Sequence, residues 1–163
     1  MQINKFDDID KTILVLLQKN GRITNAQLAS EAGISPSAML ERVKRLEKNG
    51  VIRQYVALLN PEKIGRCMFG LVSVSLAMHK YSSIHRFEME ISKLSEVLEC
   101  YHIAGEYDFL IKIVVSSMKE YEDFLIKRLT KIEGINKVHT NFILSTVKHS
   151  TKIPIDPQTF EVE

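Results

Sequence analysis

A chain of 163 residues with a formal net charge of +2 is long enough for one domain or for two small ones. It has no apolar run of about 18 residues and no basic segment followed by an apolar core near its start, so neither a membrane span nor a secretion signal is expected. Cys67 and Cys100 lack the spacing of metal ligands or of a disulfide framework. We therefore expect a cytoplasmic protein with reduced cysteines, no metal and no cofactor.

The first predicted helix covers residues 8–20. Its apolar residues share one face and are Ile9, Ile13, Leu16 and Leu17. The acidic residues Asp7, Asp8 and Asp10 suit the positive end of the helix dipole. Asn20 and Gly21 end the helix.

Residues 25–32 form the second predicted helix, whose two ends carry clear sequence signals. Thr24 is a suitable N-cap, and Gln27 three residues later completes a capping box. Gly33 follows at the position where a left-handed residue ends a helix at low cost. The turn to the next helix is therefore expected to be tight.

The third predicted helix runs from Pro36 to about Asn49, with Ser35 as its N-cap and Gly50 as its stop. At about 100° per residue, one side of this helix is apolar and consists of Met39, Leu40, Val43 and Leu46. The opposite side carries Ser37, Ala38, Glu41, Lys44, Arg45 and Lys48, with Arg42 at the flank. We expect the apolar side to pack on the two preceding helices.

Two helices joined by a tight turn, the second with a basic outer face, are typical of a segment that fits the major groove of DNA. Small residues allow close approach to base edges, and an arginine such as Arg45 can read a base or hold a phosphate. The alternative is a solvated amphipathic helix in a small bundle, which the glycine turn and the Ser-Pro cap disfavour. The expected DNA-binding residues are Arg22, Ser35, Ser37, Ala38, Glu41, Arg42, Lys44, Arg45, Lys48 and Arg53, with Arg22 and Arg53 as backbone clamps.

Residues 51–59 alternate loosely and are rich in β-branched and apolar side chains, which predicts a strand or a short hairpin. Three helices with a trailing strand indicate a winged-helix module in residues 1–60. Residues 60–61 mark a break, and residues 61–69 are expected to be a linker. Residues 1–60 hold nine Lys/Arg against six Asp/Glu, whereas residues 61–163 hold thirteen against fourteen. The basic surplus therefore lies in the module expected to bind DNA.

The second half of the chain shows a doubled β-α-β pattern. Strands are expected at residues 70–78, 97–103, 109–115 and 135–147, and helices at residues 83–94 and 118–132. The order βαββαβ is the ferredoxin-like arrangement, an antiparallel four-stranded sheet with two helices on one face. The fold class is therefore α+β, with a second domain at residues 70–150 and a tail at residues 151–163.

Helices on one face of this sheet leave its other face open. That open face holds either Val72, Val74, Ile111 and Ile113 or the complementary set of alternate residues. An uncovered apolar sheet face would be a liability in a monomer. We therefore expect a homodimer in which two sheets pack face to face.

From about Phe6 to about Lys148, the chain resembles the Lrp/AsnC, or feast/famine, family of bacterial and archaeal transcription regulators. The segments that carry the resemblance are DDIDKTIL from Asp7, NGRIT from Asn20, AGISPSAMLERVKRLE from Ala32, GVI from Gly50 and GEYD from Gly105. The N-terminal match is the more specific, because length, order and turn chemistry agree. The resemblance implies dimers that often assemble further into octamers, and an amino-acid effector bound between C-terminal domains.

The loop at residues 104–108 has two interpretations. Its residues alone favour a hairpin turn, in which Gly105 permits positive φ. The resemblance implies an effector site, where backbone N–H groups near Gly105 hold a carboxylate and Asp108 accepts from an ammonium group. Tyr107 would then form a wall, and Glu106 would either favour a basic ligand through its charge or lie exposed at the tip of the turn. The expected effector-binding residues are Gly105, Glu106, Tyr107, Asp108 and Thr140, the last from the resemblance alone.

No enzymatic arrangement stands out, so no catalytic residue is assigned. The five histidines lack metal-ligand spacing, and neither a Ser/His/Asp set nor a phosphate-binding loop is visible. One alternative is a subunit similar to sirohaem decarboxylase, whose subunits look like this family, with His102 beside the expected effector site at residues 104–108. Another is a DNA-organising protein that needs no effector. The residues favour a DNA-binding transcription regulator, and the resemblance implies that it responds to an amino acid.

Overall fold

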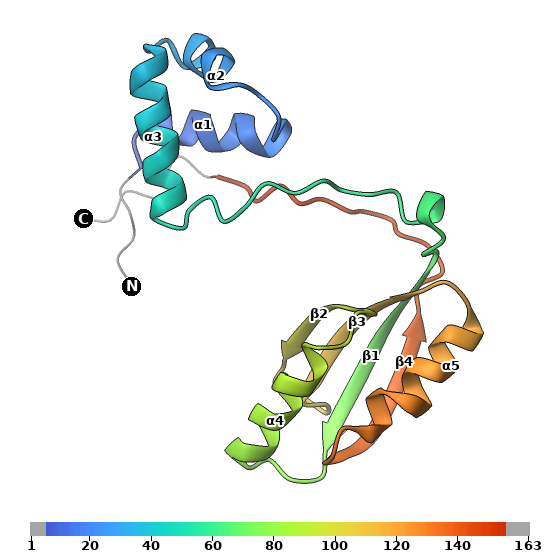
Figure 1. The fold of residues 1–163 in the computed structure, drawn as a ribbon. Helices are drawn as coiled ribbons and strands as arrows, with labels where there is room; N and C mark the ends of the chain where they lie inside the picture. Colours follow the sequence, from blue (N-terminus) through green and yellow to red (C-terminus); the bar gives the residue numbers. More distant parts are fainter. Residues whose placement is uncertain (1–5, 156–163) are drawn as a thin grey trace. The chain divides into compact units, whose positions relative to one another are not determined.

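The computed structural model describes residues 6–155 (Figure 1). The described chain forms two compact units. Residues 6–58 together with residues 148–155 make the N-terminal unit, and Leu59–Val147 make the C-terminal unit. Within the described residues, no helix combines the length and the apolar character needed to cross a membrane.

The N-terminal unit contains helices α1 (Asp8–Lys19), α2 (Asn25–Ala32) and α3 (Pro36–Lys48). The predicted capping box is confirmed, because Thr24 accepts from the backbone N–H of Gln27 and the Gln27 side chain accepts from that of Thr24. Gly33 has a φ of 68° and ends α2 in the left-handed conformation that its lack of a Cβ permits. Ser35 accepts from the backbone N–H of Ala38 at 3.2 Å, as expected for the N-cap of α3.

A small apolar core holds these helices together. Its buried members are Ile13, Leu28, Ala29, Met39, Val43 and Leu46. Leu40 was predicted to be buried but is 38% exposed. It lies one residue beyond Met39, about 100° around the helix, so the core beneath Met39 does not cover it. Leu40 instead lines a shallow depression with Leu17 and Tyr55.

The segment that follows α3 differs from its prediction. Residues 51–59 form no strand, and Figure 1 shows them as an irregular trace. A strand needs a neighbour for its backbone hydrogen bonds, and the one sheet of the described residues consists of strands from elsewhere in the chain. The apolar side chains that suggested a strand, such as Val56 and Leu58, are exposed. Tyr55 donates to Glu47 at 2.9 Å and so holds this segment to α3.

The chain returns to the N-terminal unit near its end. The amide nitrogen of Gln18, on α1, donates to the carbonyl of Ile153 at 3.2 Å, and the Gln18 amide oxygen accepts from the backbone N–H of Ile153 at 2.6 Å. One side chain thus satisfies both backbone groups of one residue. The described part of the predicted tail, residues 151–155, is therefore attached to α1, while residues 156–163 lie outside the described residues.

The C-terminal unit has the predicted ferredoxin-like order. Its elements are β1 (Met68–Leu76), α4 (Tyr81–Ile91), β2 (Val97–His102), β3 (Phe109–Val115), α5 (Met118–Lys127) and β4 (Ile135–Phe142). The strand order is β2-β3-β1-β4, and every neighbouring pair is antiparallel. Strand β4 ends at Phe142 rather than at residue 147, because its pairing with β1 ends where Phe142 meets Gly70. Helix α5 ends at Lys127 and is followed by a separate 3-10 turn, so the predicted helix was too long.

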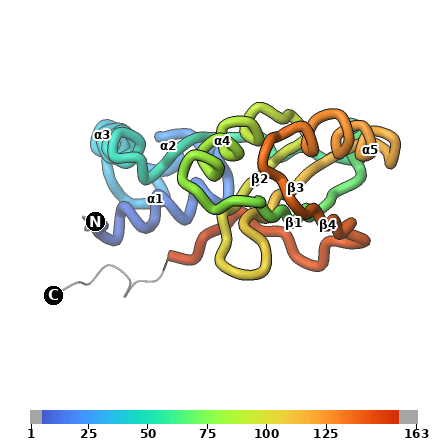
Figure 2. The backbone as a smooth tube through the Cα atoms, turned by 90° about the horizontal axis from the view of Figure 1, so that it is seen from below, coloured from blue at the N-terminus to red at the C-terminus, as the bar shows by residue number. Residues whose placement is uncertain are grey.

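The sheet buries one face and leaves the other without a helix layer. Figures 1 and 2 show α4 and α5 on the same face. The core between sheet and helices consists of Val72, Val74, Leu76, Phe109, Ile111, Ile113, Phe87, Ile91, Phe124, Leu129 and Ile132. The opposite face carries the complementary set of strand residues, Leu71, Ser73, Leu110, Lys112 and Val114, which are partly exposed. Of the two predicted alternatives, the complementary set is therefore the one left for a second subunit.

The start of α5 contains a carboxylate that makes stability depend on pH. Hydrogen bonds from the Ser116 hydroxyl and backbone N–H, the latter at 2.7 Å, and the Arg66 guanidinium lower the pKa of Glu120 from 4.5 to about 2. Because the folded pKa lies below the ordinary value, the stabilisation is complete above about pH 4.5 and is lost as the pH falls toward 2. We expect Glu120→Gln to lower the thermal midpoint near neutral pH, and the difference from the parent to shrink over that acidic range.

The matched control for this prediction is Glu62→Gln, at an exposed position in the same unit. Thermal melts of both variants and the parent at several pH values measure the effect. A difference between Glu120→Gln and the parent that stayed constant between about pH 5 and 2 would contradict the assignment.

Candidate DNA-binding helix and effector loop

The outer face of α3 is open to solvent along its whole length. The exposed residues are Ser35, Ser37, Ala38, Glu41, Lys44, Arg45 and Lys48. Ser35 and Ser37 share a hydrogen bond of 3.1 Å at the N-terminal end, where the helix dipole favours an anion. Lys44 is 61% exposed and lies 3.9 Å from Glu41, a loose surface pair. The predicted arrangement of small residues followed by cations is therefore present on the surface.

The two arginines of α3 bind carboxylates of α1. Arg45 Nη2 lies 2.8 and 2.6 Å from the two carboxylate oxygens of Asp10. Arg42 Nη1 lies 2.9 Å from Asp10 and 2.6 Å from Asp7. Burial alone would raise the pKa of Asp7, but the Asp10 backbone N–H and the Arg42 guanidinium hold it below its usual value. Both arginines therefore have acidic partners within their own chain.

The sequence predicted Asp10 only as a partner of the helix dipole, so this pairing was not expected. The sequence does indicate that Asp10 lies on the buried face of the helix, because Asp10, Ile13 and Leu17 follow the three- and four-residue spacing of one helix face. That face packs inward, and Asp10 is 2% exposed. A carboxylate on a buried face needs a partner, and the nearby cations of α3 were the available ones.

The two predicted backbone clamps lie at the edges of the same unit. Arg22 is exposed in the turn between α1 and α2, where its backbone N–H donates to the Asn20 side chain at 3.0 Å. Arg53 is exposed in the segment after α3. Burial of the ring and the hydrogen bond to Glu47 raise the pKa of nearby Tyr55 to about 12, so this tyrosine stays a neutral donor.

The effector loop joins β2 to β3 and is fixed at Asp108. The Asp108 carboxylate accepts from the backbone N–H of Leu76, at the end of β1, at 2.7 Å. Its second oxygen lies 2.8 Å from Nε2 of His79. Gly105 has a φ of 154°, which L side chains rarely adopt. The loop therefore joins two antiparallel strands, as its residues predicted, and both oxygens of Asp108 already have a partner within the chain.

Glu106 and Tyr107 extend from this loop toward β4. Lys137 Nζ lies 3.0 Å from Glu106 and 5.0 Å from the centroid of the Tyr107 ring. Hydrogen bonds to Glu106, and then to Tyr107, raise the pKa of Lys137. The Tyr107 ring also stacks on His139 with centroids 6.5 Å apart. These groups form a polar cluster on the open side of the sheet.

Thr140 does not join this cluster within one chain. Successive residues of a strand point to opposite faces, so Thr140 points away from the face of Lys137 and His139. Its Oγ1 accepts from the Tyr121 hydroxyl at 2.8 Å, and Tyr121 belongs to α5 on the helix-covered side. The structure therefore brings together four of the five predicted effector residues and separates the fifth.

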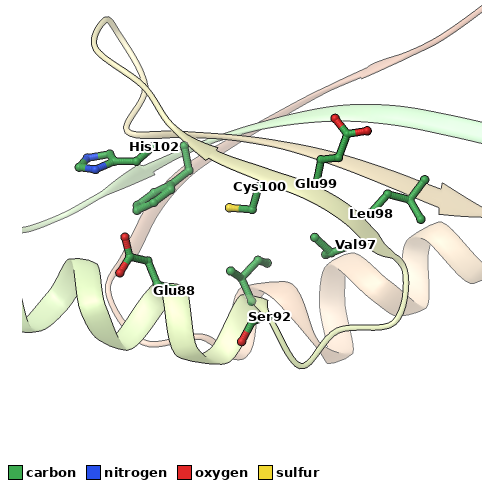
Figure 3. Close-up of a pocket in the computed structure, with 9 residues that line it drawn as sticks. Glu88, Ser92, Val97, Leu98, Glu99, Cys100 and His102 are labelled. Carbon is green, nitrogen blue, oxygen red and sulfur yellow. The ribbon is translucent and has the colours of Figure 1, made fainter. Parts of the chain in front are cut away.

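A cavity of about 360 Å³ lies between α4 and β2 (Figure 3). Figure 3 shows Cys100 pointing from β2 toward the helix that carries Glu88 and Ser92. Burial and the charge of Glu88 raise the pKa of Cys100 to about 11, so its thiol stays protonated at neutral pH. The His102 ring stacks on Phe109 with centroids 4.8 Å apart. Among residues 6–155, no group of His, Cys, Asp and Glu has a metal-binding geometry. This cavity was not predicted from the sequence.

A helix-turn-helix unit with an exposed outer helix, joined to a ferredoxin-like unit, is the organisation of a ligand-responsive DNA-binding regulator. Residues 6–53 match the family model of winged helix-turn-helix DNA-binding domains, and residues 70–153 match that of the Lrp/AsnC ligand-binding domain. Leucine-responsive regulatory proteins of Escherichia coli and Salmonella typhimurium are each 37% identical over 149 residues, which cover 91% of this chain and 91% of theirs. The chain belongs to the Lrp/AsnC family of DNA-binding transcriptional regulators.

Solved structures agree with this assignment. A transcriptional regulator of Neisseria meningitidis in complex with L-Met has a TM-score of 0.86 and 34% identity, covering 91% of this chain and 96% of that one. An AsnC family regulator of Agrobacterium tumefaciens has the same TM-score and identity, covering 91% of this chain and 97% of that one. The winged helix-turn-helix plus ferredoxin-like fold is therefore that of the family, although residues 51–59 of this chain form no strand.

Proposed function

We propose that this protein is a sequence-specific transcription regulator whose DNA affinity or assembly responds to an amino acid. The observation that carries the proposal is the pairing, in one chain, of an exposed recognition helix with a loop that gathers charged and aromatic groups. Relatives support the ligand class, because one group is named leucine-responsive and one solved relative holds L-Met. A regulator of this kind would act in the cytoplasm, where it meets chromosomal DNA.

The proposed effector site is the loop at residues 105–108. An amino acid presents a carboxylate, which needs hydrogen-bond donors, and an ammonium group, which needs a negatively charged acceptor. Backbone N–H groups around Gly105 would hold the carboxylate, and Asp108 would accept from the ammonium group in place of His79. Tyr107 supplies an apolar wall. Thr140 is the least supported member, because its hydroxyl already pairs with Tyr121.

The proposed regulation depends on assembly. A ligand shifts an equilibrium only when it binds the two states with different affinities. The loop is exposed within a single chain, apart from the partly buried Tyr107 and Asp108. A site completed by a second subunit would therefore exist only in the assembled state, which provides the required difference. We propose a homodimer as the basic unit, with higher assemblies such as an octamer built from it.

The effector assignment predicts a large loss of ligand affinity in Asp108→Asn. This variant keeps an oxygen that can accept from the Leu76 N–H but loses the negative charge that an ammonium group needs. A hydrogen bond to a charged group contributes about 1.5–3 kcal/mol, so we expect roughly 10- to 100-fold weaker binding. Calorimetry with the common amino acids on parent and variant measures this loss, together with DNA binding with and without the ligand.

The matched control is Asp123→Asn, an acid of α5 that pairs with Lys127 at 2.7 Å and lies outside the loop. It should bind the amino acid like the parent. Equal affinity of parent and Asp108→Asn for the same ligand would place the effector site elsewhere. If no amino acid bound the parent, the alternative of a DNA-organising protein without an effector would be favoured.

A further inference from the structure

Asp10 is a buried carboxylate in the middle of the DNA-binding unit. Its side chain is 3% exposed, and among the described residues only Glu96 is a second buried charged residue. Moving a carboxylate out of water is costly unless charged partners replace the water. In this unit the partners come from α3, the proposed recognition helix, so the buried charge links α1 directly to the DNA-binding surface.

The geometry of this link is well defined. Arg45 places one nitrogen between both oxygens of Asp10, at 2.8 and 2.6 Å, while Arg42 bridges Asp10 and Asp7 at 2.9 and 2.6 Å. Asp7 is the N-cap of α1 and Asp10 lies in its first turn, while Arg42 and Arg45 lie three residues apart on one face of α3. Two carboxylates thus meet two guanidinium groups, and the cluster has no net charge.

The rest of α3 offers different cations. Lys44 is 61% exposed and its pairing with Glu41 is loose at 3.9 Å. Lys48 is exposed near the end of the helix. Within the described residues, the ion pairs of α3 are those of Arg42, Lys44 and Arg45, and Lys48 makes none. Neither lysine has an acidic partner closer than 3.9 Å in this part of the chain, whereas Arg42 and Arg45 are paired with Asp7 and Asp10, Arg45 while its side chain remains 52% exposed.

We propose that Asp10 is a positioning residue of the DNA interface. It sets the rotation of α3 against α1 and withdraws Arg42 and Arg45 from the charge presented to DNA, so that Lys44 and Lys48 bind the phosphates. This inference rests on the proposed DNA-binding function. It changes the role of Arg45, which the sequence alone made a candidate base reader.

The test is the salt dependence of binding to a duplex of about 30 bp and arbitrary sequence, because each phosphate contact contributes about 0.9 to the slope of log affinity against log salt. The variants are Arg45→Met, which keeps the apolar stem of the side chain, Asp10→Asn, which is nearly isosteric, and Lys44→Ala as the matched reference. Thermal melts and circular dichroism confirm that each variant is folded at the temperature of the binding measurement.

We expect Lys44→Ala to reduce the slope by about 0.9 for each helix on the DNA, and Arg45→Met to keep the slope of the parent with a lower thermal midpoint. Asp10→Asn should lower the thermal midpoint and make the slope steeper, because Arg45 loses its only carboxylate partner among the described residues and Arg42 keeps only Asp7. The slope distinguishes two roles of Asp10. If Asp10 positions the arginines, the slope becomes steeper, whereas a purely structural role would change only the stability.

Two results would overturn the inference. One is a slope in Arg45→Met reduced as much as in Lys44→Ala, which would make Arg45 a phosphate contact. The other is an unchanged slope in Asp10→Asn. Failure of the proposed DNA-binding function looks different, because the parent itself would then show no salt-dependent binding and Lys44→Ala would change nothing.

Discussion

Replacing Phe87 by alanine should lower the free energy of unfolding of the C-terminal unit by about 3–5 kcal/mol, the usual cost of truncating a buried aromatic side chain. Phe87 is 0% exposed, and its ring centroid lies 4.4 Å from that of Phe109. The pair joins α4 to the start of β3. Truncation would leave a cavity between helix and sheet that rigid strands cannot fully close.

The Phe87→Ala substitution should also weaken the packing that holds the effector loop in place. Phe109 directly follows Asp108, whose carboxylate accepts a hydrogen bond from the backbone N–H of Leu76 at the end of β1. With Phe87 gone, Phe109 loses a contact surface, and the position of Asp108 becomes less fixed. We therefore expect the variant to bind an amino-acid effector more weakly at temperatures where it is still folded.

Urea denaturation of the full chain followed by circular dichroism measures the stability change. Met89→Ala is the matched control, because Met89 lies on the same helix but is 52% exposed. Surface substitutions of this kind usually change stability by less than about 0.5 kcal/mol. Similar losses in Phe87→Ala and Met89→Ala would show that the Phe87–Phe109 contact is not central to the unit.

The sequence predicted best those elements whose signals are local. The capping box at Thr24, the left-handed Gly33 and the N-cap Ser35 depend on residues within four positions of each other, and all three are present. Strand β3 was predicted at its observed bounds because residues 109–115 are a short apolar run with one charge, Lys112. Residues 51–59 alternate too, yet form no strand, because a ladder requires a partner strand that local sequence does not reveal.

Tertiary pairing explains what could not be predicted about the sites. Periodicity identified the outer face of α3, but it could not show that Arg45 reaches back to Asp10. Alternation divided the sheet residues into two sets without showing which set the helices cover. The loop at Asp108 was identified correctly as a turn, while its bond to Leu76 depends on how β1 and β3 pair. Each missing fact concerns residues distant in the sequence.

Introducing a charge at Leu110 should convert the protein to a monomer. Leu110 lies on the sheet face that has no helix layer, opposite Ser73 on the neighbouring strand. Leu71 and Val114 lie on the same face, and all three are only partly exposed. In the proposed dimer this face packs against its copy, so Leu110→Glu would bury two carboxylates near each other without partners, which is strongly unfavourable.

Light scattering at micromolar concentration measures the change in mass, and Met89→Glu, at an exposed position on the other side of the sheet, is the matched control. A dimer places two recognition helices on half-sites separated by a multiple of about 10 bp, so its footprint should have two-fold symmetry. Because the second helix then binds at a high effective concentration, we expect the monomeric variant to lose about 100-fold or more in operator affinity. A monomeric parent, or a Leu110→Glu variant with the mass and symmetric footprint of the parent, would exclude the sheet face as the dimer interface.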